Sequence, residues 1–107
     1  MKINIVSSVE LTSSLEEYAE RKFGALGKLV GSFEEKGEVQ VWLEIKENKR
    51  HETGDVFTAV ADMRLMKKVL HAEAKGETMR TAIDEARDIL RAEIEKNRKK
   101  LLPKRGK

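Results

Sequence analysis

Four arginines in the last third of the chain have a spacing that could bind phosphate. Counting about 100° per residue along a helix, they fall within roughly 40° of one another, and they are Arg80, Arg87, Arg91 and Arg98. A guanidinium group forms paired hydrogen bonds with phosphate, so a row of arginines suits a polyanion. The alternative is a solvated face on which nearby acids, such as Asp84 for Arg87, form weak ion pairs.

Positive charge is concentrated toward the C-terminal end. Residues 1–74 contain 11 Lys and Arg against 13 Asp and Glu, and residues 75–107 contain 11 against 6, so net charges of −2 and +5 give the +3 of the whole chain. From residue 96 onward there is no acid, and the bases are Lys96, Arg98, Lys99, Lys100, Lys104, Arg105 and Lys107. A basic face on an otherwise slightly acidic domain attracts a polyanion. We expect nucleic acid as the first partner class and an anionic membrane surface as the second.

Other residues that could do chemistry are few. The chain has no cysteine, which excludes thiolate metal sites and cysteine nucleophiles, and neither His51 nor His71 has a second histidine at i+4. We expect His71 to form a local hydrogen bond in a strand. The glycines form no phosphate-binding loop, and the Ser and Thr residues at 12–14 are explained by helix capping. The sequence therefore argues against an enzyme, a metal site and a bound cofactor.

The arginine stripe requires a helix with a buried face behind it. Between residues 77 and 101, apolar residues recur at i, i+3, i+4 and i+7, the period of an amphipathic helix. The predicted buried face consists of Met79, Ala82, Ile83, Ala86, Ile89, Leu90, Ile94 and Leu101. Thr78 is a suitable N-cap, and Pro103 prevents any helical extension.

The remaining elements follow from local patterns. Strands are predicted over residues 1–6, 39–46, 56–64 and 69–74, from apolar–polar alternation and β-branched residues. Trp42, in the second strand, falls on the side away from the core. One helix is predicted from the capping residues 12–14 to about Val30, with Gly31 at its end. The last two strands would form a hairpin through residues 65–68, where no Gly, Asn or Pro marks a turn.

The element order β-α-β-β-β-α predicts an α+β two-layer sandwich. A four-stranded, mostly antiparallel sheet with two helices on one face buries the apolar stripe of each helix. A chain of 107 residues supports one such core, and we expect a single domain over residues 1–101 with a basic tail, 102–107, that has no fixed structure. The first apolar run is too short for a signal peptide, and no stretch approaches ~18 apolar residues, so we expect a soluble, cytoplasmic protein.

Four short motifs extend along most of the chain. The most specific is Thr-Met-Arg-Thr-Ala-Ile-Asp at residues 78–84. The others are Met-Lys-Ile-Asn-Ile at residues 1–5 with Glu-Leu-Thr at 10–12, Leu-Glu-Glu-Tyr at 15–18 leading to Lys22-Phe23 and Leu26, and Leu-His-Ala-Glu-Ala-Lys-Gly at 70–76. Over residues 1 to about 101 this pattern resembles the short ribosome-hibernation factors, the protein Y and hibernation-promoting factor family. The first motif is similar to that family's Asp-Met-Tyr-x-Ala-Ile-Asp.

The resemblance implies both a fold and a function. Its fold is the β-α-β-β-β-α sandwich, and its members bind the small ribosomal subunit and its rRNA through basic residues on both helices. They occupy the mRNA and tRNA channel and inhibit translation under stress or in stationary phase, without catalysis. The resemblance implies RNA contact at Lys22, Lys28, Arg87, Arg91, Lys96, Arg98, Lys99 and Lys100, with Arg80 adding charge at the family's tyrosine position.

Two departures from the family pattern affect these expectations. Ala25 stands where the family has a lysine, which weakens the expected contact of the first helix with RNA, and Thr78 stands where it has an aspartate. We expect no counterpart of the C-terminal dimerisation domain of the long hibernation factors. The alternative functions are a protein-interaction module that uses the open sheet face or the basic helix, for example as a modulator of a transcription factor, and a general domain for structured RNA.

Overall fold

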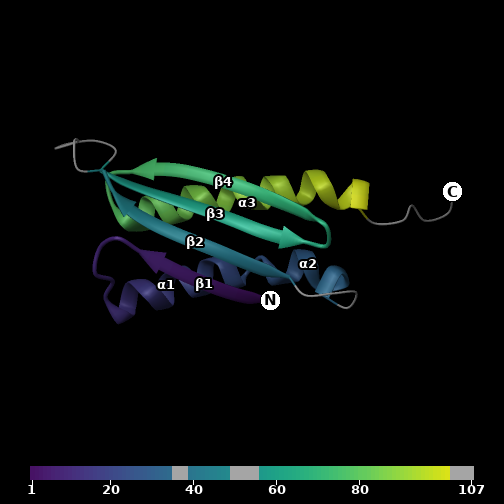
Figure 1. The fold of residues 1–107 in the computed structure, drawn as a ribbon, viewed down its shortest axis with the longest axis horizontal. Helices are drawn as coiled ribbons and strands as arrows, with labels where there is room; N and C mark the ends of the chain where they lie inside the picture. The colour runs from purple at the N-terminus through teal and green to yellow at the C-terminus, as the bar shows by residue number, and fades with distance from the viewer. Residues whose placement is uncertain (35–38, 49–55, 102–107) are drawn as a thin grey trace, which may run out of the picture.

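A four-stranded sheet forms one layer of the molecule and the helices form the other (Figure 1). The computed structural model describes residues 1–34, 39–48 and 56–101, without the side chains of 32–34 and 98–101. The strands lie in the order β1 (Lys2–Ser7), β2 (Gln40–Glu47), β3 (Phe57–Leu65) and β4 (Lys68–Gly76). β1 pairs with β2 in parallel, and the other neighbours are antiparallel. The predicted α+β sandwich is confirmed.

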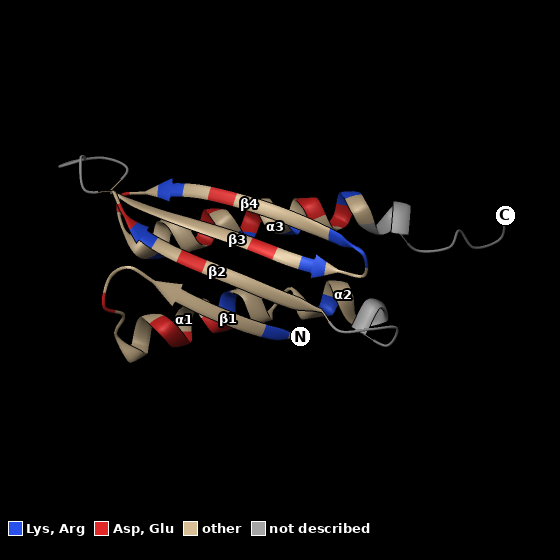
Figure 2. Cartoon of the chain, in the orientation of Figure 1, with Lys and Arg blue, Asp and Glu red and all other residues tan. Residues whose placement is uncertain are grey.

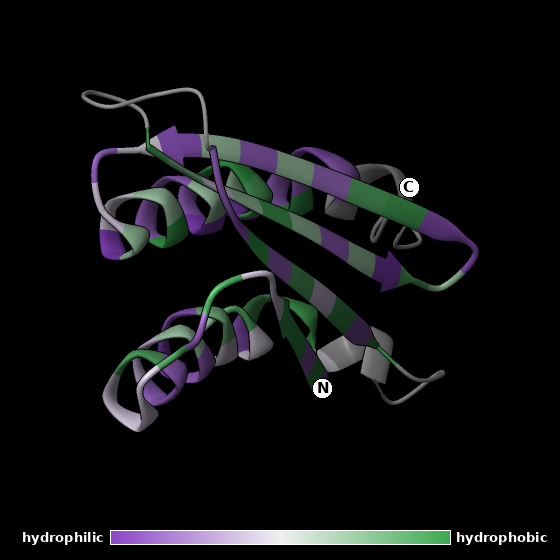
Figure 3. Cartoon of the chain, turned by 60° about the vertical axis from the view of Figure 1, so that its left-hand side comes forward, coloured by the Kyte–Doolittle hydropathy of each residue, from purple (hydrophilic) through white to green (hydrophobic). Residues whose placement is uncertain are grey.

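Alternation along the strands gives the sheet one buried and one open face. Val41, Leu43 and Ile45 in β2 are buried, whereas Trp42 between them is 41% exposed on the opposite face, as predicted. Figure 3 shows the same alternation of apolar and polar residues along the strands. The core side of β3 and β4 carries small residues, which leave room for the last helix over these two strands: Ala59, Ala61, Ala72 and Ala74.

The first predicted helix is in fact two helices. α1 spans Ser13–Gly24 and α2 spans Gly27–Glu34, so the expectation of one helix ending near Val30 was wrong. Between them, the N–H of Leu26 donates to the carbonyl oxygen of Phe23 at 3.0 Å, an i→i+3 bond that tightens the chain. Phe23 and Leu26 are both buried as a result. Burial of both side chains in the core therefore accompanies the break in the helical period.

Threonine side chains cap the N-terminal ends of the first and last helices. Thr12 Oγ1 accepts from the N–H of Leu15 at 3.1 Å, and Thr78 Oγ1 accepts from the N–H of Thr81 at 3.1 Å. α3 spans Met79–Leu101. Gly31 does not end its helix, because α2 continues to Glu34.

The last helix approaches the end of β4 closely. A Cβ atom on Gly76 would lie 2.8 Å from the backbone nitrogen of Ala82, a distance that real side chains do not tolerate. Glycine at the end of β4 therefore allows α3 to fold back under the sheet.

The predicted hairpin between the last two strands is confirmed. Leu65 pairs with Lys68, which leaves a two-residue turn of Met66 and Lys67. Met66 has a φ of 58°, a left-handed conformation that costs a non-glycine residue roughly 1–2 kcal/mol. The strands on either side hold this turn closed despite the unsuitable residue.

Of the described residues predicted for the buried face of α3, Ile89 is exposed and Met79 is only half-buried against the core. Ala82, Ile83, Ala86, Leu90 and Ile94 are fully buried, but Ile89 is 41% exposed. Helical geometry places Ile89 at the edge of the band of apolar side chains on α3, and the sheet covers only the centre of that band. Asn97 lies near the centre instead, where its Nδ2 donates to the carbonyl oxygen of Glu93 at 2.7 Å.

Two predictions about the end of the chain fall outside this description. The side chain of Leu101 and all of residues 102–107 are not among the described residues. The limit of the domain at residue 101 and the unstructured tail stay predictions.

Candidate nucleic-acid interface

Basic residues from three helices meet along one line on the helical layer. α3 lies beside α1 and α2 and contacts both. We call this line, where α1 and α2 face α3, the helical seam. It brings together five of the predicted RNA-contact residues: Lys22 from α1, Lys28 from α2, and Arg80, Arg87 and Arg91 from α3. Figure 2 shows where the basic and acidic residues lie on these helices.

A tyrosine organises the end of the seam near the start of α3. Tyr18 Oη donates to Asp84 Oδ1 at 2.5 Å, which joins α1 to α3. The same carboxylate oxygen lies 3.6 Å from Lys22 Nζ. The guanidinium carbon of Arg80 lies 4.4 Å from the centre of the Tyr18 ring, and its Nη2 donates to Ser14 Oγ at 3.5 Å. Arg80 is therefore held against the ring by a cation–π contact.

This arrangement raises the pKa of the tyrosine, which is already above neutral pH in an ordinary tyrosine. The hydrogen bond to Asp84 raises the pKa of Tyr18 above its usual value, and burial and the negative charge of Asp84 raise it further. The positive charges of Arg80 and Arg21 act in the opposite direction but do not reverse the shift. Tyr18 is therefore a stable hydrogen-bond donor at neutral pH, and Asp84 is its acceptor.

A shallow pocket of about 190 Å³ lies further along the seam. Its apolar walls come from Ala25, Leu26 and Leu29, and its basic rim from the side chains of α2 and α3, which are Lys28, Arg87 and Arg91. Ala25 stands where a lysine was expected from the family pattern, and here it forms part of the wall. The pocket thus combines apolar walls with three cations, a combination suited to a nucleobase and its phosphate.

The arginines of the pocket have acidic neighbours, but not those considered from the sequence. Arg87 Nε lies 2.9 Å from Asp88 Oδ1, and Arg91 Nε lies 3.6 Å from Glu95 Oε2. The Arg87 side chain is only 21% exposed, and its contact with Asp88 lacks the geometry of a hydrogen bond. Its Nε is therefore buried without a hydrogen-bond acceptor among the described residues, and the charge of Asp88 is its nearest compensation.

The remaining predicted residues lie toward the end of α3. Lys96 is exposed there. Arg98, Lys99 and Lys100 belong to α3, and their side chains are outside the described part of the chain. The stripe is therefore established in the structure for Arg80, Arg87 and Arg91.

Sequence reasoning missed the cluster that positions Arg80. Ser14, Tyr18 and Arg21 were not among the predicted site residues, yet Arg21 also lies with its guanidinium carbon 5.7 Å from the centre of the Tyr18 ring. One signal was available, because Tyr18 and Arg21 are three residues apart and so share a helix face. The pairing of Tyr18 with Asp84 depends on how the helices pack, and no local pattern reveals it.

The described residues form neither a metal site nor a membrane-spanning helix. Within residues 1–34, 39–48 and 56–101, no three His, Asp or Glu side chains are grouped so that they could hold a metal ion. No helix of that same part of the chain is long and apolar enough to cross a lipid bilayer. His71 forms the local hydrogen bond that was predicted, with 2.6 Å between its Nδ1 and Asp62 Oδ1.

Comparison with known families decides the relationship. The family model described as sigma 54 modulation protein / S30EA ribosomal protein matches residues 3–102. The chain belongs to this family. The resemblance inferred from the sequence motifs is thereby confirmed. No curated protein matches the chain significantly in sequence.

Solved structures share the fold of this family member. The N-terminal domain of Protein Y from Thermus thermophilus is 20% identical, with a TM-score of 0.69 over 89% of this chain and 93% of that one. A ribosomal subunit interface protein from Coxiella burnetii is 17% identical, with a TM-score of 0.73 over 92% of this chain and 99% of that one. At these identities the likeness establishes the fold alone.

Proposed function

We propose that the helical seam binds rRNA of the small ribosomal subunit and that the protein inhibits translation by occupying the mRNA and tRNA channel. The proposal includes no reaction, because the protein acts by filling a volume that other ligands need. It implies a cytoplasmic protein that acts under stress or in stationary phase. The family relationship and the relative described as a ribosomal subunit interface protein support a ribosomal partner.

The observation that carries the proposal is the basic pocket of the seam. Lys28, Arg87 and Arg91 reach it from two helices that are distant in sequence, so the fold gathers charge that the sequence only places in a row. Their acidic neighbours are on the solvent side, where Asp88 and Glu95 are more than half exposed. The Arg91–Glu95 pair is exposed on both sides, and such pairs are worth at most about 1 kcal/mol, so phosphate can replace Glu95 at small cost.

The other end of the seam supports the same mode of binding. Arg80 lies against Tyr18, and among the described residues its one hydrogen bond is the long one of 3.5 Å to Ser14, so most of its N–H groups remain available. Holding the side chain in place before binding lowers the entropy lost on contact with a phosphate. Ribosomal RNA presents dense phosphate that needs no base-specific reading, and a preorganised row of cations suits it.

A pair of charge-reversal variants tests the proposal. We expect Arg87→Glu combined with Arg91→Glu to lower co-sedimentation with purified small subunits at least tenfold. The matched control is Lys46→Glu combined with Lys75→Glu, which changes the net charge equally but lies on the open face of the sheet. Thermal melts of both proteins check that they fold. Undiminished binding by the folded seam variant, or an equal loss in the control, would contradict the proposed interface.

A further inference from the structure

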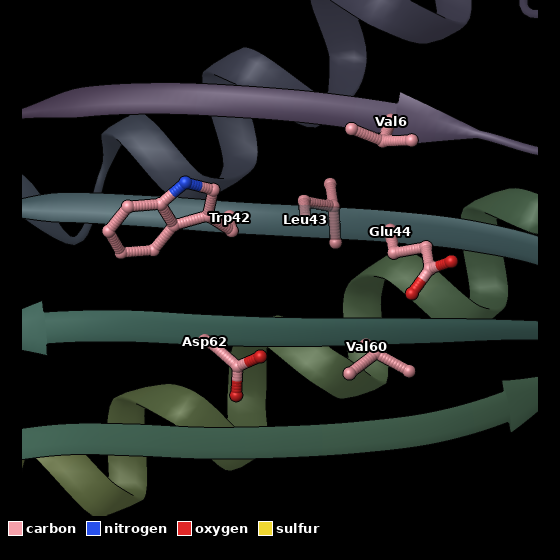
Figure 4. A pocket seen from close by; sticks show the side chains of 6 residues that line it. All are labelled: Val6, Trp42, Leu43, Glu44, Val60 and Asp62. Atoms are coloured by element: carbon pink, nitrogen blue, oxygen red, sulfur yellow. The ribbon is translucent and has the colours of Figure 1, made fainter.

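The open face of the sheet carries a second pocket, on the side opposite the helical seam. It has a volume of about 300 Å³ and is lined by Val6, Trp42, Leu43, Glu44, Val60 and Asp62. Figure 4 shows these side chains on three adjacent strands: the Trp42 ring extends along β2 away from Glu44, the carboxylate of Glu44 lies between Val6 and Val60, and Asp62 lies on β3. The pocket is therefore built on rigid strands and not on a loop.

Strand pairing explains why these residues meet. Trp42 is the cross-strand partner of Asp62, and Glu44 is the partner of both Val6 and Val60. Directly paired side chains on one face lie about 5 Å apart, so an indole, two valines and two carboxylates share one small area. The surface stays uncovered within the molecule, since Val6 is 62% and Trp42 is 41% exposed.

The charges of this face have a definite pattern. Its middle carries Glu44, Asp62 and Glu73, one acid on each of three neighbouring strands (Figure 2). Asp62 is already engaged by His71, but Glu44 has no hydrogen bond or ion pair within the described part of the chain. Within the described residues, His71 lies between Asp62 and Glu73 in the middle of this face. The Lys and Arg residues of the face stand at the two ends of the strands: Lys2, Lys46, Arg64 and Lys75.

We propose that this pocket binds an arginine or lysine side chain presented by a short basic segment of a partner protein. The aliphatic stem of such a side chain packs on Val6 and Val60 while its charged group pairs with Glu44, the cross-strand partner of both valines. Glu44, Asp62 and Glu73 repel RNA phosphate. The pocket therefore suits a cationic partner, whereas the seam suits an anionic one. The two sites lie on opposite layers, and this inference does not depend on the proposed function.

The chain offers a direct readout of this site, because Trp42 is its one tryptophan. The probe is the peptide acetyl-Arg-Ala-Arg-Ala-Arg-amide, titrated against the intact protein while indole emission is followed. We expect a saturable change in emission. The same peptide with citrulline in place of each arginine, which keeps the shape and removes the charge, should bind at least tenfold more weakly.

Variants distinguish the pocket from general attraction between charges. Glu44→Gln combined with Asp62→Asn should weaken peptide binding at least tenfold and leaves Trp42 in place to report it. The matched control is Glu16→Gln combined with Glu20→Gln, which removes equal charge from exposed positions on α1 and should bind as the unchanged protein does. Equal binding of the citrulline peptide, or an equal loss in both variants, would overturn the proposal.

Two other possible ligands would change Trp42 emission in different ways. If a second copy of the chain covered the pocket, Trp42 emission would change with protein concentration in the absence of peptide. If nucleic acid were the ligand, a single-stranded RNA decamer would give a saturable change as strong as that of the peptide. Either result would overturn the assignment to a basic protein segment.

Discussion

Neighbouring positions in the middle of α3 test how the helix packs on the sheet. Leu90 is completely buried, whereas Ile89 beside it is 41% exposed. Leu90→Ala removes three buried carbon atoms, which at about 0.8 kcal/mol each gives roughly 2.4 kcal/mol from transfer alone. The cavity left behind collapses only partly, which adds to this cost. We therefore expect the free energy of unfolding to fall by about 3 kcal/mol, within the range of roughly 2–5 kcal/mol for such changes.

Ile89→Ala is the matched control. It removes the same number of carbon atoms from a largely solvated site, and alanine has a higher helix propensity than isoleucine, so we expect a loss below about 1 kcal/mol. The assay is urea unfolding followed by Trp42 emission and by far-UV circular dichroism. A loss of about 3 kcal/mol corresponds to a fall of roughly 12–24 °C in Tm for a domain of this size. A small loss at Leu90, or equal losses at both positions, would show that the helix is packed on a different face.

Three further predictions concern single contacts. Tyr18→Phe removes the hydrogen bond to Asp84 and should cost about 1 kcal/mol of unfolding free energy in urea melts, and an unchanged midpoint would contradict the link between α1 and α3. Met66→Gly relieves the φ of 58° and should raise Tm, with a fall in Tm counting against a strained turn. The hydrogen bond to Asp62 raises the pKa of His71 above 6.5, so its stabilising effect is complete below that pH and is lost as the pH rises through the raised pKa. NMR titration should show this pKa falling in Asp62→Asn, and an unchanged value would refute the pairing.

The sequence was sufficient to predict the order of strands because alternation there reflects one buried face. Even the hairpin at residues 65–68 was predicted without a turn residue, since the flanking strands determine the pairing while Met66 accepts an unfavourable conformation. The break between α1 and α2 could not be predicted. It depends on Phe23 and Leu26 being buried together, and this is a property of the packed core.

The candidate site shows the same division between local and tertiary information. Helical period was enough to place Arg80, Arg87 and Arg91 on one flank of α3. It could not show that Lys28 joins them at a pocket, because that meeting depends on how α2 lies against α3. The acidic partners were also misjudged, since side-chain rotamers and not spacing alone decide which carboxylate each arginine reaches.

The central claim is that the seam occupies the mRNA and tRNA channel of the small subunit through phosphate contacts. The most direct measurement is competition between this protein and initiator tRNA with mRNA on purified small subunits, repeated across a salt series. Six of the predicted contact residues have described side chains, namely Lys22, Lys28, Arg80, Arg87, Arg91 and Lys96. If all six release counterions, the slope of log affinity against log salt is about −4 to −5, and tRNA and this protein exclude each other. Simultaneous binding of both ligands, or an affinity that does not change with salt, would contradict the claim.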